Sequence, residues 1–203
     1  MLKIWGRVNS INVQKVMWAV GELGIPYERT DAGMQFGVVN TPDYRKLNPN
    51  SRVPTIEDDD FVLWESNTIV RYLYEKHGPR RTLRERATSE RWMDWTLAHV
   101  HPSLTTIFWQ LYRTPQDKRD MPAVEAAAKQ AGEVLKIADS ALASQPFIAG
   151  AELTPGDIPL GCFANRWFQA AIERPDLKNL AAWYERLKTR GPYRQHVAGV
   201  PLT

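Results

Sequence analysis

The stretch VPTIEDDDFVLWES, residues 53–66, decides the fold class of this chain. Two short apolar runs flank a turn of three aspartates, which is the pattern of an antiparallel hairpin. Directly after the hairpin, Ile69, Val70, Leu73 and Tyr74 recur at helical spacing, and the pattern ends at Gly78. A hairpin that leads straight into an amphipathic helix predicts a sheet with a helix on one face.

The residues before the hairpin alternate between strand and helix patterns. LKIW, residues 2–5, predicts a short strand, and the apolar spacing from Val13 to Leu23 predicts a helix. YERTD, residues 27–31, predicts a second strand, and residues 43–48 predict a short helix. The order β-α-β-α-β-β-α predicts an α/β domain with a compact mixed sheet over residues 1–78.

Strand patterns disappear beyond Gly78 and Pro79. Helices are predicted instead over residues 91–114, 121–142, 154–172 and 177–192, with a bend in the first of them at Pro102. We therefore expect a linker over residues 79–86 and an all-α domain over residues 87–203.

The composition excludes several classes of protein. With 43% hydrophobic and 24% charged residues among 203, the chain has the make-up of an ordinary globular protein. A net charge of +3 without a clustered basic patch argues against nucleic-acid binding. No stretch approaches the ~20 apolar residues of a membrane span, and residues 1–9 lack the apolar core of a signal peptide. A single cysteine, Cys162, excludes an internal disulfide, so we expect a cytoplasmic protein.

Ser10 and Asn12 lie where the first strand turns into the first helix, and two interpretations are open. Either residue type is a favoured helix cap. Alternatively, a hydroxyl at a helix N-terminus stabilises an anion such as a thiolate. The helix dipole contributes roughly 0.3–1 kcal/mol and the hydroxyl roughly 1.5–3 kcal/mol. Together they lower a thiol pKa by about 1.5–3 units from ~8.5, which is enough for ionisation at neutral pH.

Two further stretches carry groups that suit a peptide-like ligand. If Pro54 is cis, the backbone N–H and C=O of Val53 face outward and can pair with an extended peptide. Arg52 is either a solvent-facing charge or a contact for a carboxylate. At the start of the third helix, Glu65 can accept an ammonium group, and Ser66 is either a cap or part of a carboxylate site. A ligand with this layout of charges and a central thiol is glutathione.

The motifs NSINVQKV, ELGIPYE, NPNSRVPTI, LWESNTIVRYL and LTPGDIPLGC resemble those of the soluble glutathione S-transferases along essentially the whole chain. The resemblance is to serine-type members of the theta- or beta-like bacterial branch. It implies a thioredoxin-like N-terminal domain, an all-helical C-terminal domain and a homodimer. It also implies conjugation of glutathione, as co-substrate, to an electrophilic and apolar small molecule, as in detoxification, without a metal.

The resemblance also implies roles for individual residues. Ser10 corresponds to the activating hydroxyl and Asn12 to a second donor. Val53 corresponds to the residue whose backbone pairs with the cysteinyl unit, and Pro54 to the cis proline. Arg52 corresponds to the contact for the glycyl carboxylate. Glu65 and Ser66 correspond to the pair that recognises the γ-glutamyl unit, and Asn40 to a further glutathione contact. The second-substrate pocket is expected to include Trp95, His99 and Phe108. Thr154 with Asp157 corresponds to a capping box.

Other interpretations remain beside this one. The first strand does not end in tyrosine and no cysteine lies near Ser10, which argues against the tyrosine- and cysteine-type enzymes. A glutathione-dependent disulfide reductase without a catalytic cysteine fits the same residues. A non-catalytic scaffold is disfavoured because it needs no ligand site. Cys162 is expected in the core. His99 and His101 are two residues apart and cannot share a helix face, which argues against a metal site. For His99 we predict a packing role, with a place in a pocket as the alternative.

Overall fold

A computed structural model describes residues 1–203, which divide into two compact units. The first unit comprises Met1–Arg80 and Pro192–Val200, and the second comprises Arg81–Gly191 and Pro201–Thr203. The division falls inside the predicted linker, but two assignments differ from the prediction. A helix already begins at Leu83, within the predicted linker, and residues 192–200 pack with the first unit, although the sequence placed them in the helical domain.

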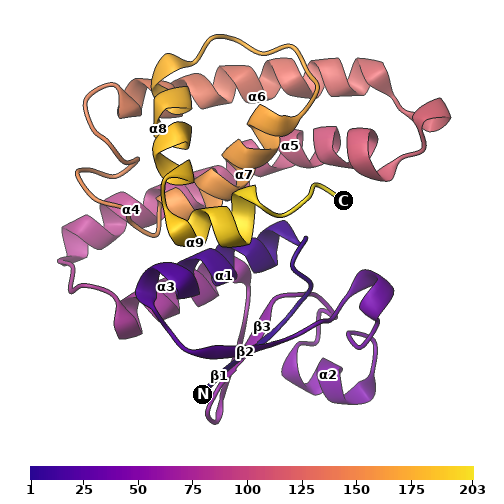
Figure 1. The fold of residues 1–203 in the computed structure, drawn as a ribbon, viewed down its shortest axis with the longest axis vertical. Helices are drawn as coiled ribbons and strands as arrows, with labels where there is room; N and C mark the ends of the chain where they lie inside the picture. Colours follow the sequence, from indigo (N-terminus) through magenta and orange to yellow (C-terminus); the bar gives the residue numbers. More distant parts are fainter. The chain divides into compact units, whose positions relative to one another are not determined.

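The first unit contains the predicted four-stranded mixed sheet (Figure 1). Its strands are β1 (Leu2–Trp5), β2 (Tyr27–Thr30), β3 (Thr55–Asp58) and β4 (Phe61–Trp64), in the order β2-β1-β3-β4. β1 runs parallel to β2 and antiparallel to β3, and β3 and β4 form the predicted hairpin. Parallel neighbours require a crossover, which the first helix provides. This is the thioredoxin-like arrangement.

The two sheet faces carry different helices. Leu2 and Ile4 of β1 lie in one apolar cluster with residues of α1 (Ile11–Leu23) and α3 (Ser66–His77), which pack side by side (Figure 1). Because strand side chains alternate between faces, Trp5 points to the opposite face. There its ring meets that of Tyr44 from α2 (Pro42–Leu47), edge to face at 5.9 Å. A 3₁₀ turn, Met34–Phe36, precedes α2.

The returning segment, residues 192–200, completes the first unit against α1. The rings of Trp18 and Tyr193 meet edge to face at 4.6 Å, and both side chains are fully buried. Gly21 of α1 leaves room for this contact, because a Cβ there would lie 2.8 Å from Pro192. Sequence periodicity could not identify this long-range contact.

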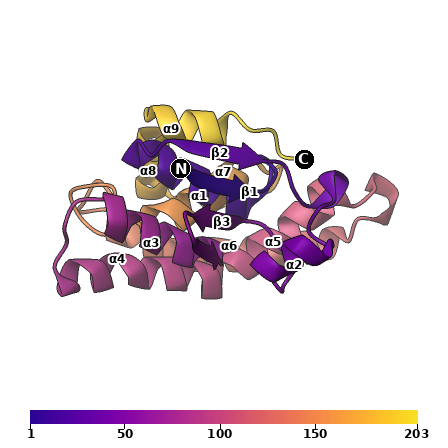
Figure 2. The same ribbon diagram turned by 90° about the horizontal axis from the view of Figure 1, so that it is seen from below.

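The regular elements of the second unit are helices. They are α4 (Leu83–Trp95), α5 (His101–Phe108), α6 (Met121–Leu142), α7 (Asp157–Gln169) and α8 (Lys178–Lys188). The short helix α9 (Gly191–Tyr193) begins in this unit and continues in the first. Figure 2 shows α4 and α5 following one another along the chain. None of the helices is both long and apolar enough to span a bilayer.

The predicted bend at Pro102 coincides with a break in the α-helical pattern. Residues Thr96–Val100 form a π-helical turn between α4 and α5, and the N–H of His101 bonds to the carbonyl of Thr96, five residues earlier. Proline has no N–H to continue the i→i−4 ladder, so a change of hydrogen-bond pattern beside it is expected. The predicted helical stretch is therefore helical, and the hydrogen-bond pattern changes just before Pro102.

Asp157 organises the buried core around α7. Its carboxylate accepts hydrogen bonds from the backbone N–H of Thr154 (2.9 Å), the N–H of Ile148 (2.9 Å) and Nε1 of Trp183 (3.0 Å). Burial raises the pKa of Asp157, and these hydrogen bonds oppose the rise. Only half of the predicted capping box forms, because the Thr154 hydroxyl accepts from Gly156 N–H (3.3 Å). Asp157 therefore links the segments that contain Ile148, Thr154 and Trp183, and its role is not limited to capping α7.

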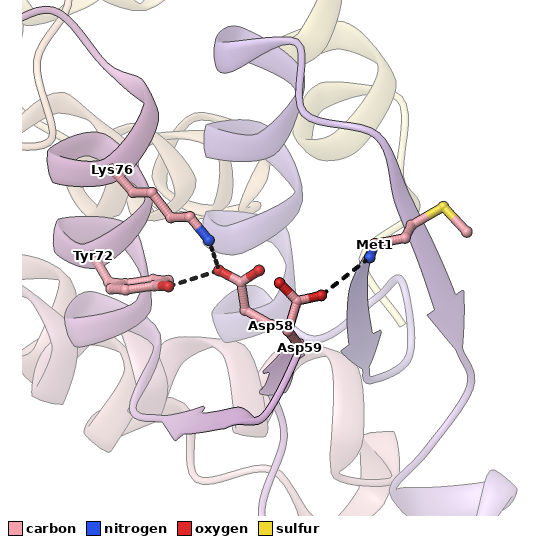
Figure 3. Close-up of polar contacts among 5 residues, drawn as sticks. All are labelled: Met1, Asp58, Asp59, Tyr72 and Lys76. Carbon is pink, nitrogen blue, oxygen red and sulfur yellow. Dashed lines mark hydrogen bonds and ion pairs between the residues drawn. The ribbon is translucent and has the colours of Figure 1, made fainter.

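In the first unit, the hairpin turn is tied to α3 by Asp58 (Figure 3). Its carboxylate accepts from Lys76 Nζ and from the Tyr72 hydroxyl, each at 2.6 Å. The hydrogen bond from Lys76, followed by that from Tyr72, lowers the pKa of Asp58. The neighbouring Asp59 pairs with the Met1 ammonium group at 3.6 Å. The turn is thus held on both sides.

We predict that Asp58→Asn lowers stability in a pH-dependent way. Because folding lowers the pKa of Asp58, its contribution is complete above the unfolded value of ~3.9 and disappears as the pH falls through the folded value. The difference in free energy of unfolding between wild type and variant, measured with urea, should be constant near pH 7 and shrink below about pH 4. Asp59→Asn is the exposed control and should cost less. A difference that does not change down to about pH 2 would contradict this account.

Candidate functional site

Three loops leave the sheet at the same edge because of the strand register. Thr55, the first residue of β3, pairs with Trp5 at the end of β1 and with Trp64 at the end of β4. The loop after β1, the loop before β3 and the turn after β4 therefore start from one row of the sheet. The sequence candidates lie in these loops or in the first turn of the helix that follows: Ser10 and Asn12 at the start of α1, Arg52 to Pro54 before β3, and Glu65 and Ser66 at the start of α3.

Gly6 allows the first two loops to approach each other. A Cβ at this position would lie 2.4 Å from Val13 Cγ2 and 3.3 Å from Val53 Cβ. The φ angle of Gly6 is 153°, which other residues rarely adopt. Arg29 Nη1 donates to the Gly6 carbonyl at 2.6 Å and fixes this turn. A glycine is therefore needed where β1 enters the loop to α1.

Ser10 occupies the N-cap position of α1, but its hydroxyl makes no capping hydrogen bond. The backbone carbonyl of Ser10 begins the helix by accepting from Gln14 N–H at 2.8 Å. The side chain is buried, with 7% of its surface exposed. The simple capping interpretation of Ser10 is therefore not supported, and the hydroxyl remains available beside the first N–H groups of α1.

Asn12 and Ser66 are joined through Lys15, which sequence reasoning missed. Lys15 Nζ lies 3.0 Å from Asn12 Oδ1 and 3.5 Å from Ser66 Oγ, and Ser66 Oγ donates to Asn12 Oδ1 at 3.3 Å. Lys15 is only 2% exposed, which is unusual for a lysine and requires polar partners. Since Oδ1 of Asn12 is engaged, its Nδ2 is the end that can serve a ligand. A lysine within the buried run of residues 13–20 was the available signal.

The loop before β3 has the predicted geometry at its proline. The Val53–Pro54 peptide bond is cis. Pro54 is buried, Val53 is half-buried and the side chain of Arg52 is exposed. The Arg52 carbonyl accepts from the Tyr44 hydroxyl at 2.7 Å and from Asn48 Nδ2 at 3.0 Å. The loop is therefore fixed from beneath while Arg52 reaches solvent.

The start of α3 differs from the capping prediction. Ser66 is the first helical residue, and Glu65 holds the N-cap position with φ 72°, without a capping hydrogen bond from its side chain. A positive φ at a glutamate costs roughly 1–3 kcal/mol and is concentrated at functional sites. Ser66 fails as a cap because its hydroxyl is directed to Asn12 and Lys15. The Glu65 side chain is exposed.

The remaining candidates lie in different surroundings. Asn40 is exposed just before Thr41, the N-cap of α2. In the second unit the rings of Trp95 and His99 lie 6.4 Å apart, with Trp95 half-buried and His99 exposed. The predicted packing role of His99 is therefore wrong. Phe108 is buried beneath the Arg166 guanidinium group, 3.7 Å from its ring centre.

Cysteine and metal chemistry each need a particular arrangement of side chains. Cys162 is a free thiol with no exposed surface, as the core interpretation predicted. No three His, Cys, Asp or Glu side chains come together in a way that could hold a metal ion. Apart from the Glu65 carboxylate, the groups at the sheet edge are hydroxyl, amide, ammonium, guanidinium and backbone donors, which suit an anionic ligand.

We predict that Gly6→Ala strongly destabilises the protein. Overlap of the new Cβ with Val13 and the positive φ should together lower the free energy of unfolding by roughly 2–5 kcal/mol. Gly24→Ala is the matched control, because Gly24 also has a positive φ (63°) but no atom within 4 Å of the place that a methyl group would take. In urea unfolding, Gly24→Ala should lower the free energy of unfolding by only about 1–2 kcal/mol. Equal losses in the two variants would show that the close approach at Gly6 is unimportant.

Comparisons with known proteins agree with this architecture. Residues 1–75 match the glutathione S-transferase N-terminal domain, and residues 100–190 match the C-terminal domain. The glutathione S-transferase GstB of Escherichia coli K12 is 38% identical, over 100% of both chains. Glutathione S-transferase 3 of Zea mays is 30% identical, over 99% of this chain and 95% of the relative.

A solved structure extends the likeness to three dimensions. The theta-class glutathione S-transferase of Xanthomonas axonopodis pv. citri, with glutathione bound, is 46% identical. The match covers 100% of this chain and 99% of that structure's chain, with a TM-score of 0.95. The chain therefore belongs to the glutathione S-transferase family and is an enzyme of that family.

Proposed function

We propose that the first unit binds glutathione along the sheet edge and that Ser10 stabilises its thiolate for conjugation to an electrophile. The observation that carries this proposal is the row Trp5–Thr55–Trp64, from which all three candidate loops emerge. A Ser10 hydroxyl unused by its own helix provides the reactive end. The glutathione bound to the theta-class relative supports the choice of ligand.

Each part of glutathione has a partner of matching chemistry. The backbone N–H and C=O of Val53 pair with the cysteinyl unit in the manner of an added strand. Arg52 contacts the glycyl carboxylate, and Asn40, in the loop before α2, is a further contact for glutathione. The N-terminus of α3 at Ser66 receives the γ-glutamyl carboxylate, and Glu65 accepts the α-ammonium group.

The buried Lys15 adds to this electrostatic picture. Its ammonium group lies 3.5 Å from Ser66 Oγ and 3.0 Å from Asn12 Oδ1. We infer that Lys15 orients both side chains, so that the Ser66 oxygen and the Asn12 amide keep fixed positions towards glutathione. A positive charge beneath this end of the site also favours a ligand with net negative charge.

The reaction needs only thiolate activation and positioning. Ser10 donates a hydrogen bond to the sulfur, the α1 dipole favours negative charge there, and Asn12 Nδ2 is the second donor. The thiol proton passes to solvent. The sulfur then attacks the electrophilic carbon, a carbon–sulfur bond forms, and the leaving group departs with its electron pair. Trp95, His99 and Phe108 of the helical unit are our candidates for contacting the apolar electrophile.

Ser10→Ala should lower kcat by roughly 10- to 100-fold, because one hydrogen bond to a charged sulfur is worth roughly 1.5–3 kcal/mol. The KM for glutathione should change little, since the backbone and carboxylate contacts remain. Steady-state assays with a chlorinated aromatic electrophile provide the measurement.

Two controls sharpen this experiment. Ser10→Thr keeps a hydroxyl and should retain most of the activity, and Ser103→Ala removes a comparably buried serine from the helical unit. Parallel assays with a glutathione-mixed disulfide test the reductase alternative. Wild-type turnover of the disulfide alone, or equal turnover of the wild type and Ser10→Ala, would contradict the proposal.

We also propose that the chain forms a homodimer in the cytoplasm. The dimer rests on the family resemblance, and the location rests on the single, buried cysteine. Sedimentation equilibrium should give twice the chain mass of 23.2 kDa. A mass of one chain at micromolar concentration would contradict the homodimer. Recovery of the protein outside the cytoplasmic fraction would contradict the proposed location.

A further inference from the structure

A closed ring of buried hydrogen bonds lies directly beneath the loop before β3. Its members are Tyr44 of α2, Asn48, Thr55 of β3 and the backbone carbonyl of Arg52. The Tyr44 hydroxyl and Thr55 Oγ1 are 2.8 Å apart, and Asn48 Nδ2 lies 3.1 Å from Thr55 Oγ1 and 3.0 Å from the Arg52 carbonyl. Tyr44 and Asn48 are each 2% exposed, and Thr55 is fully buried.

The chemistry of the partners sets the direction of every hydrogen bond. The Arg52 carbonyl can only accept, so the Tyr44 hydroxyl donates its single proton there at 2.7 Å. Thr55 must then donate to Tyr44, and Asn48 Nδ2 donates to Thr55. The opposite end of Asn48 is fixed as well, because Oδ1 accepts from the Asn50 backbone N–H at 3.0 Å. Each hydrogen bond in the ring therefore has one assigned donor: Asn48 Nδ2 donates twice, the Arg52 carbonyl accepts twice, and Thr55 and Tyr44 each donate once and accept once.

The ring fixes the orientation of the peptide group that precedes Val53. A trans peptide is planar, with its C=O and N–H pointing in opposite directions. Only the following bond, Val53–Pro54, is cis, so the Arg52–Val53 peptide is trans. Because two donors hold the Arg52 carbonyl inward, the Val53 N–H is turned away from the ring. That N–H is the donor that the proposed function assigns to the cysteinyl unit of glutathione.

We propose that Tyr44, Asn48 and Thr55 are positioning residues that set glutathione affinity by holding the Arg52–Val53 peptide group in its binding orientation. This proposal rests on the proposed function of the same site. The three residues do not touch the sulfur, so they act on binding and leave thiolate formation to Ser10. Thr55 also anchors the ring to the sheet, through its pairing with Trp5 and Trp64.

The neutral state of Tyr44 suits this arrangement. Burial raises the pKa of Tyr44, and the hydrogen bond with Thr55 opposes part of that rise. The hydroxyl therefore stays protonated at physiological pH and remains a donor to the Arg52 carbonyl. The backbone of Tyr44 is also held in place, because its N–H donates to Thr41 Oγ1 at 3.2 Å.

The test is calorimetric titration with S-methylglutathione, which has the backbone and carboxylates of glutathione but no ionisable thiol. Tyr44→Phe and Asn48→Ala should each raise its Kd by about three- to tenfold, the effect of one or two lost hydrogen bonds. With glutathione, KM should rise by a similar factor while kcat stays within about twofold. Thr55→Ser keeps the hydroxyl and should bind nearly as the wild type does.

Tyr184→Phe is the matched control. It also removes a buried tyrosine hydroxyl, which donates to Asn165 Oδ1 at 2.9 Å within the helical unit, so its Kd should not change. Unchanged Kd in both Tyr44→Phe and Asn48→Ala, with a wild type that binds, would overturn the positioning proposal alone. Losses in kcat as large as those in affinity would also overturn it. A wild type that fails to bind S-methylglutathione would overturn the proposed function itself.

Discussion

The pairing of Thr55 with Trp5 and Trp64 is the constraint on which the site depends. In this sheet the end of β1, the start of β3 and the end of β4 meet at one edge, since β3 is antiparallel to both neighbours. A shift of one residue in this register would turn Ile56 out of the apolar cluster and Thr55 into it. The apolar core under α1 and α3 therefore also fixes the positions of the loops at the sheet edge.

Two buried polar networks convert this register into a defined binding surface. One joins Asn12, Lys15 and Ser66, and the other joins Tyr44, Asn48 and Thr55 to the Arg52 carbonyl. A buried polar group without a partner costs roughly 1–3 kcal/mol, so each network favours a single arrangement in which all partners are met. Groups that neither network uses, such as the Ser10 hydroxyl and the Val53 N–H, are those proposed to meet glutathione.

Local patterns predicted much of this structure. Hydrophobic spacing predicted the hairpin at residues 55–64 and the helices α1 and α3. The alanine-rich stretch that Pro122 opens predicted α6. The cis geometry at Pro54 was left open by its place before the hairpin and was implied by the family resemblance. The roles of Lys15 and Asn48 could not be predicted this way, because both depend on partners that only folding brings close. The packing of residues 192–200 on α1 and the burial of Ser66 away from a capping role have the same origin.

The most direct test of the account is an ultraviolet difference spectrum of the protein titrated with glutathione at neutral pH, recorded for the wild type and for Ser10→Ala. We predict saturable thiolate absorbance in the wild type. The same titration of Ser10→Ala should show saturable binding with most of that absorbance lost, because the pKa of the bound thiol rises back towards ~8.5. Equal thiolate absorbance in both proteins, or binding without thiolate in the wild type, would contradict the central role of Ser10.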